Sequence, residues 1–248
     1  MIDGEECALL YRDDYLVAVN KPSGLLVHRS PIDRHETRFA LQIVRNQVGQ
    51  HVFPVHRLDK PTSGVLLFGL SSAMARALSE QFAAGSVHKH YLAVVRGHCP
   101  SAGIIDYALK QQLDKIADRD SRTDKPAQEA RTRYKRLATV EIPVAVDRYP
   151  QTRYSLVHLC PETGRKHQLR RHMKHIGHPI IGDAKHGKGL HNRFFKAQYD
   201  CQRLLLACTR LEFIHPISGK RLVVEAELDA PFLRVIKAFG WQNALTQV

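Results

Sequence analysis

The segment from His56 to Gly64 contains the first candidate catalytic residues of the chain. It reads His-Arg-Leu-Asp-Lys-Pro-Thr-Ser-Gly, with the acidic Asp59 among basic neighbours just before an apolar run. A carboxylate in such a turn would project from the rim of a sheet, where binding and catalytic residues often lie. The same pattern also fits an aspartate that only caps the turn. The local pattern therefore leaves a catalytic and a structural interpretation of Asp59 open.

The second chemical segment, residues 162–183, is strongly basic. Between residues 161 and 196, nine Lys or Arg stand against two acids, a density that suits phosphate contacts along RNA or DNA. Apolar residues at helical spacing predict a helix from near Arg165 to Gly177, with Arg165 at the head of its buried face. A guanidinium that points inward needs an anion, for which a carboxylate is the natural partner. A purely structural ion pair is the alternative.

Four histidines in the same segment raise the question of a metal. They are His167, His172, His175 and His178. Their spacing provides no pair four residues apart with a supporting acid, and the Lys and Arg between them would repel a cation. We therefore predict no metal site. The chain also lacks the glycine-rich phosphate loop, the dinucleotide fingerprint and the GxSxG turn, which argues against nucleotide-dependent enzymes and serine hydrolases.

The composition is that of a globular protein with a polyanionic partner. Hydrophobic residues make up 44% of the 248 residues, and 37 Lys and Arg exceed 24 Asp and Glu, for a net charge of +13. A strongly basic balance favours nucleic acid. The chain has neither an apolar run of the ~18 residues that a membrane span needs nor the pattern of a secretory signal. Its five cysteines, without a CxxC pair, indicate reduced thiols and a cytoplasmic protein.

Short apolar runs and turn signals predict an α+β fold, because strands and helices mix without a βαβ rhythm. Alternation along residues 91–95 places Tyr91, Ala93 and Val95 on one face of a strand. The polar stretch 110–136 is predicted to be an insertion or an edge element. We expect strands near 8–11, 15–19, 25–27, 65–70, 91–95, 136–140, 152–159, 203–206 and 222–226. Further helices are expected near 41–48, 72–84 and 231–239.

Taken together, these segments resemble the motifs of the RluA-type pseudouridine synthases. His56–Gly64 resembles the catalytic motif of that family, and Lys89–Ala93 resembles the segment that carries its active-site tyrosine. Asn20–Gly24 with Val27 and His28 is similar to the first motif, and Thr163–Arg170 with His178–Asp183 is similar to the later basic motif. The motifs follow the order of the family between about residues 7 and 225. One departure is Ala207, where relatives often have His.

The resemblance implies a pseudouridine synthase fold with a mixed, largely antiparallel central sheet, flanking helices and a central active-site cleft. We expect one catalytic domain over residues 1–248, without an N-terminal S4 domain. The implied reaction is the cofactor-free isomerisation of uridine to pseudouridine in RNA. Within the family the chain looks closest to members that act on uridine 65 of tRNA. The same reaction on ribosomal RNA, a non-catalytic RNA-binding protein and a metal-dependent nuclease stay open as alternatives.

The resemblance also implies roles for individual residues. Asp59 would be the essential carboxylate, held ionised by Arg165, and Tyr91 would stack on the target base. Arg57 would fill the space that a flipped base leaves behind. We expect a monomer whose partner is RNA rather than DNA or a membrane. The predicted phosphate contacts are Lys21, Lys60, Lys166, Arg170 and Arg171.

Overall fold

The computed structural model describes residues 6–29, 35–111 and 126–247. Contacts between residues divide the chain into two compact units. Unit 1 comprises residues 1–89, 109–128 and 208–227, and unit 2 comprises residues 90–108, 129–207 and 228–248. One catalytic domain over residues 1–248, as expected from the sequence, stays a prediction. Within the described residues, no helix has the length and apolar character that a membrane crossing requires.

Unit 1 is a largely antiparallel sheet with two helices. In this unit β2 pairs with β1 and β4, β3 pairs with β4, and β10 pairs with β9, whose residues from Cys208 onward belong here. Valines of β2 and apolar residues of β4 pack against α1 and form one core. Every residue of β4 is buried. The elements are β1 (Ala8–Arg12), β2 (Leu16–Lys21), α1 (Ala40–Val48), β3 (Phe53–Pro54), β4 (Ser63–Gly69), α2 (Ser72–Ala83), β9 (Leu206–Ile214) and β10 (Arg221–Glu225).

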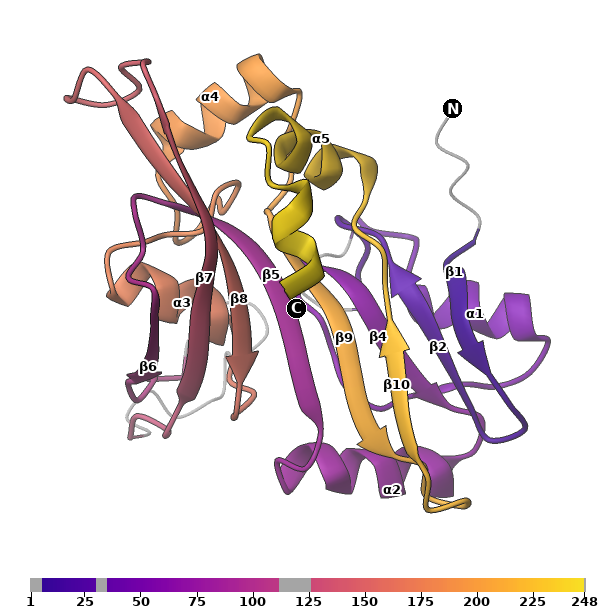
Figure 1. The fold of residues 1–248 in the computed structure, drawn as a ribbon. Helices are drawn as coiled ribbons and strands as arrows, with labels where there is room; N and C mark the ends of the chain where they lie inside the picture. The colour runs from indigo at the N-terminus through magenta and orange to yellow at the C-terminus, as the bar shows by residue number, and fades with distance from the viewer. Residues whose placement is uncertain (1–5, 30–34, 112–125, 248) are drawn as a thin grey trace. The chain divides into compact units, whose positions relative to one another are not determined.

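Unit 2 has an antiparallel sheet in the order β5-β8-β7-β6, visible in Figure 1. Leu92 and Val94 of β5 belong to a core with α4 and α5, whereas Ala93 and Val95 belong to a second core with α3. The predicted alternation along this strand is therefore confirmed. The elements are β5 (His88–Arg96), β6 (Ala102–Asp106), β7 (Arg131–Ile142), β8 (Thr152–Pro161), α3 (Gln168–His175), α4 (Gly189–Tyr199), α5 (Ala230–Ala238) and the 3-10 helix η1 (Gln242–Gln247).

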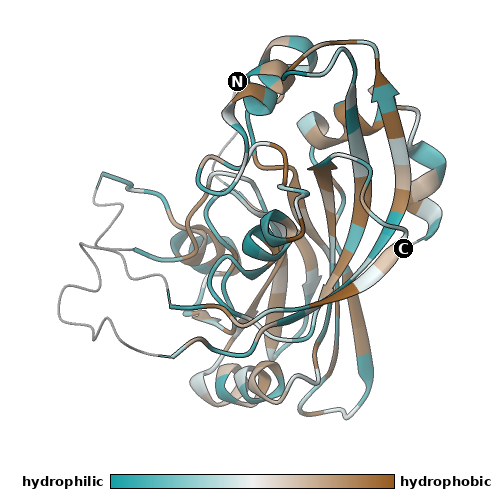
Figure 2. Ribbon diagram, turned by 90° about the vertical axis from the view of Figure 1, so that its left-hand side faces the viewer, coloured by the Kyte–Doolittle hydropathy of each residue, from teal (hydrophilic) through white to brown (hydrophobic). Residues whose placement is uncertain are grey.

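Local signals in the sequence explain where several helices begin and end. The Ser71 hydroxyl accepts a hydrogen bond from the amide of Met74 and caps α2, and Asp229 caps α5 in the same way. Gly49 ends α1 in the left-handed conformation that glycine adopts without strain. Figure 2 shows brown, hydrophobic residues in many strands, which alternate on some strands with pale and teal, hydrophilic ones. The predicted α+β class with a largely antiparallel sheet is confirmed.

Some predicted elements are wrong. Residues 131–136 are not an insertion or an edge element, because they form the start of β7 and pair with both β6 and β8. The segment 25–27 makes only a bridge between Leu26 and Phe39. The sequence analysis missed β6 and α4, and β9 begins only at Leu206. Ala207, the departure from the family pattern, is buried in the core with α4 and α5. Residues 112–125 of the predicted insertion lie outside the described residues.

Candidate active site

Asp59 lies in a tight turn of unit 1 that leads into β4. The amide of Thr62 donates to the carbonyl of Asp59 at 2.9 Å and closes the turn. Leu58 before Asp59 and Thr62 after it are both buried, at 5% and 3% exposure, and anchor the two ends. Asp59 itself is half-buried. The turn therefore presents its carboxylate from a fixed backbone at the start of a buried strand.

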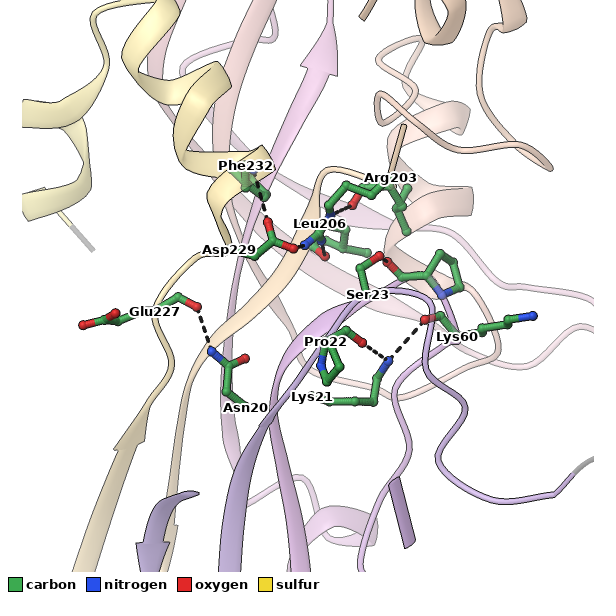
Figure 3. A network of polar contacts seen from close by, with 12 residues as sticks. Asn20, Lys21, Pro22, Ser23, Lys60, Arg203, Leu206, Glu227, Asp229 and Phe232 are labelled. Atoms are coloured by element: carbon green, nitrogen blue, oxygen red, sulfur yellow. Dashed lines mark hydrogen bonds and ion pairs between the residues drawn. The ribbon is translucent and has the colours of Figure 1, made fainter. Parts of the chain in front are cut away.

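The buried ammonium group of Lys21 holds the backbone of this turn by hydrogen bonds. Lys21 at the end of β2 is 0% exposed, and its Nζ donates to the carbonyls of Pro22, Leu25 and Lys60 at 2.9, 2.7 and 3.2 Å. Figure 3 shows the bonds to Pro22 and Lys60. A side chain without exposed surface cannot reach a phosphate, so the predicted phosphate contact of Lys21 is wrong. Because Lys21 donates to the carbonyl of Lys60, the residue after Asp59, it holds the backbone that carries Asp59.

Two further bonds connect the same segments. The hydroxyl of Ser23 donates to the carbonyl of Pro61 at 2.7 Å, and the amide of Gly24 donates to the carbonyl of Lys60 at 2.8 Å. The segment that resembles the first motif of the family thus holds the segment that resembles the catalytic one. This contact gives a physical reason for the presence of both motifs: the first fixes the backbone on which the second displays Asp59.

Gly64 allows the backbone after the turn to approach β9 closely. It has a φ of +111°, and a Cβ at this position would lie 2.0 Å from the carbonyl oxygen of Cys208. Any other residue would both strain the backbone and collide with that strand. Gly64 is therefore needed for packing within unit 1.

The basic neighbours of Asp59 differ in their exposure. Arg57 is exposed, whereas Lys60 is half-buried and forms an ion pair with Glu36 at 2.8 Å. The Nε2 atom of His56 accepts a hydrogen bond from the amide of Leu67 at 3.2 Å. Burial, with a smaller effect of the Lys89 charge, lowers the pKa of His56 to about 3. His56 is thus a neutral structural acceptor, and the predicted RNA contacts in this segment rest on Arg57 and Lys60.

Tyr91 belongs to unit 2. It lies on β5 opposite Leu159 of β8 and packs, half-buried, against the core that includes α3. This position leaves part of the ring accessible while the strand fixes its direction. The arrangement fits both a core tyrosine and a tyrosine that contacts a ligand.

Arg165 lies outside the helix that was predicted to carry it. The helix α3 begins at Gln168, after His167 in a left-handed conformation with φ of 56°. Arg165 is exposed, and its Nε donates to the carbonyl of Glu129 at 3.0 Å. The prediction that Arg165 heads a buried helix face is therefore wrong. Lys166 is exposed as well.

Gln168 is a positioning residue that the sequence analysis missed. Its side chain is buried, and its Oε1 accepts from the Thr163 hydroxyl at 2.7 Å and from the Arg165 amide at 3.0 Å. Its Nε2 donates to the carbonyl of Arg131 and to the hydroxyl of Thr132, both at 3.0 Å. The amide thus ties the turn that carries Arg165 to β7. In the sequence Gln168 follows a basic run, and nothing in that local pattern indicates this role.

Arg170 forms a buried ion pair with Asp183. Its Nε and Nη2 donate to the two carboxylate oxygens at 2.7 and 2.8 Å, and both residues are at most 5% exposed. Although burial alone would raise the pKa of Asp183, hydrogen bonds from Arg170 and from the amides of His186 and Lys185 hold it below its ordinary value. The predicted phosphate contact of Arg170 is therefore wrong. Arg171 is half-buried and stays a candidate.

The predicted site residues are distributed over the two units. Unit 1 brings together Lys21, Arg57, Asp59 and Lys60, and unit 2 carries Tyr91, Arg165, Lys166 and Arg171. The predicted pairing of Asp59 with Arg165 joins the two units and stays a prediction.

Comparison with known proteins places this arrangement in a family. The model of the family described as RNA pseudouridylate synthase matches residues 15–175. A tRNA pseudouridine synthase C of Vibrio cholerae serotype O1 is 52% identical over 237 residues, which cover 96% of this chain and 97% of that protein. A protein of the same name from Pasteurella multocida is 56% identical over 233 residues, covering 94% and 96%.

A solved structure supports the same assignment. Human RNA pseudouridylate synthase domain containing 4 matches with a TM-score of 0.68 and 26% identity, covering 94% of this chain and 93% of that one. The family match includes the Asp59 turn, Tyr91 and the segment around Arg165. The chain therefore belongs to the RNA pseudouridylate synthase family, whose members isomerise uridine to pseudouridine in RNA.

Proposed function

We propose that the protein isomerises a uridine of tRNA, uridine 65, with Asp59 as the essential carboxylate. The observation that carries this proposal is the Asp59 turn, in which a half-buried carboxylate stands on a backbone held by Lys21, Ser23 and Gly24. Several buried hydrogen bonds are needed to hold this turn, whereas an ordinary surface loop does not need them. The tRNA substrate rests on the names of the two bacterial relatives.

The reaction breaks the bond between N1 of the base and C1′ of the ribose, turns the base, and forms a bond from C5 to C1′. The proton on C5 leaves to solvent, and N1 gains a proton. Asp59 would either attack a carbon atom or remove a proton from the ribose. Both routes need an ionised carboxylate, and we assign Arg165 as the cation that favours it. Tyr91 would hold the uracil ring by stacking.

RNA binding would use the exposed and half-exposed cations. A base inside an RNA helix must leave its stack before a carboxylate can reach it. Arg57 is exposed beside the Asp59 turn and has a planar guanidinium that can take the place of the base. Lys60, Lys166 and Arg171 would contact phosphates. We expect the enzyme to act as a monomer in the cytoplasm.

Release of tritium from tRNA labelled at C5 of uridine tests the proposal. Asp59→Asn keeps the size of the side chain and removes its charge, so release should fall to background while tRNA binding persists. Asp14→Asn, at an exposed aspartate of the same unit, is the matched control and should keep full release. Full turnover by Asp59→Asn would overturn the assignment of the carboxylate.

The substrate needs a separate measurement. Pseudouridines are mapped in all RNA from cells that lack the gene, with and without the wild-type chain restored. Loss of the modification at uridine 65 of tRNA supports the proposal. Loss confined to ribosomal RNA would replace the substrate, and an unchanged map would favour a non-catalytic RNA-binding protein.

A further inference from the structure

Three side chains that commonly bind metals meet on β5 and β8 of unit 2. The register of β5 and β8 pairs Tyr91 with Leu159. Their neighbours His90 and Cys160 also lie close together, with Nδ1 and Sγ 3.8 Å apart. His158 precedes Cys160 by two residues on β8 and shares its face of the sheet. Because neighbouring residues of a strand point to opposite faces, the cluster lies on the face away from Tyr91.

The three ligand atoms already stand at distances that suit one ion. The Nδ1 atom of His90 is 3.0 Å from Nε2 of His158. The Sγ atom of Cys160 is 3.5 Å from Nε2 of His158 and 3.8 Å from Nδ1 of His90. A tetrahedral Zn²⁺ with bonds of about 2.0 Å to nitrogen and about 2.3 Å to sulfur would set its ligand atoms roughly 3.3 to 3.6 Å apart. Small side-chain movements therefore suffice to close the site.

The types of the three side chains also suit a metal. Neutral imidazole and thiolate are the forms that bind borderline metals such as Zn²⁺. All three side chains are half-buried, which leaves the cluster open to an ion from solvent and to one water ligand.

The charged groups on the neighbouring strand β7 set the strength of the site. Lys135 lies across from His158, and Arg133 lies across from Cys160. Arg133 forms an ion pair with Glu162 at 2.9 Å, which offsets its charge. Lys135 disfavours a nearby cation. We expect this repulsion to weaken the site relative to a closed structural zinc site without preventing binding.

We propose that His90, His158 and Cys160 form a Zn²⁺ site with water as the fourth ligand. Binding releases the thiol proton to solvent, and each imidazole keeps its proton on the nitrogen that faces away from the metal. The ion would connect β5 to β8 directly behind Tyr91. These histidines are not the four for which a metal was considered in the sequence, because only the register of two distant strands brings them together.

Metal titration of the tag-free protein tests this site directly. The chain, stripped with a chelator and kept reduced, is titrated with Zn²⁺ against a chromophoric chelator. One equivalent should bind, and the thermal midpoint should rise on binding. Substitution with Co²⁺ should give the near-ultraviolet absorption of a thiolate bond and the strong visible bands of a tetrahedral ion.

The variants separate this cluster from the other histidines and cysteines. Cys160→Ser should abolish the thiolate band, and His158→Gln should weaken Zn²⁺ binding at least tenfold. His98→Gln, at an exposed histidine of the same unit outside the cluster, should bind as the wild type does. Lys135→Gln should bind more tightly. Circular dichroism confirms that each variant is folded. Failure of the wild type to bind one equivalent, or survival of the thiolate band in Cys160→Ser, would overturn the proposal.

Discussion

Unit 1 and unit 2 each contain a buried basic side chain in a segment predicted to belong to the active site. The two side chains differ in the groups that accept their hydrogen bonds. In unit 1 the ammonium of Lys21 donates to carbonyls of three loop residues. In unit 2 the guanidinium of Arg170 forms two parallel bonds to the carboxylate of Asp183. Lysine offers three rotatable donors, which suits converging carbonyls, whereas the planar fork of arginine matches a carboxylate. The same charge thus positions a loop in one unit and closes an ion pair in the other.

Burial therefore determines whether a cation in these segments supports the fold or is available to RNA. Both residues lie in segments that looked suited to phosphate, and both are removed from solvent. The exposed Lys166, four residues before Arg170, keeps the RNA-binding interpretation. Substitutions at these positions should therefore separate stability, positioning and RNA affinity.

The largest effect is expected from Arg170→Met. It leaves the carboxylate of Asp183 buried without the bidentate partner, which costs about 3–5 kcal/mol of folding free energy. Urea unfolding followed by circular dichroism measures the loss. The double variant Arg170→Met with Asp183→Leu removes both charges and should recover much of it. A loss under about 1 kcal/mol in the single variant would show that the pair contributes little.

Lys21→Met should reduce both stability and activity. It leaves the loop carbonyls without their shared donor, at a cost of about 2–3 kcal/mol. Because one of these carbonyls belongs to Lys60, next to Asp59, tritium release should fall further than the folded fraction explains. Lys220→Met, at an exposed lysine of the same unit, is the control and should change neither. Normal turnover by folded Lys21→Met would remove the positioning role.

The ion pair in unit 2 should also give a pH dependence to stability. The pKa of Asp183 is lower in the folded protein than the ordinary value of about 3.9 in the unfolded chain. Its contribution is therefore complete above about pH 4 and is lost as the pH falls further toward the folded pKa. Unfolding free energies between pH 2 and 6 should decline less steeply in Asp183→Asn than in the wild type. Equal slopes would contradict this assignment.

Lys166→Ala should give the smallest effect, confined to RNA. An exposed cation that contacts one phosphate weakens binding a few-fold, and its loss should lower the salt dependence by about 0.7–0.9 in the log-log slope. The thermal midpoint should stay unchanged. Arg76→Ala, at an exposed arginine on α2, should leave RNA affinity intact. Equal losses in both variants would indicate a general effect of charge.

Much of the local structure could be predicted because its causes lie close together in the sequence. The alternation around Tyr91 assigned its two faces correctly, and Gly49 ended α1 as expected. The order of motifs predicted the family and the reaction class that the comparisons confirm. The helix around residue 170 was placed only approximately, because the left-handed His167 delays its start.

The amino-acid sequence thus specified the chemical groups: the Asp59 turn, the strand with Tyr91 and a basic helix. Which cations are withdrawn from solvent depends on the three-dimensional fold. Lys21 donates to the carbonyl of Lys60, 39 residues away, and Arg170 pairs with Asp183 beyond the end of its helix. The fold also decided that His90 meets Cys160, because strand register joins residues 70 positions apart. Burial and pairing depend on such distant neighbours, and no local pattern of residue types encodes them.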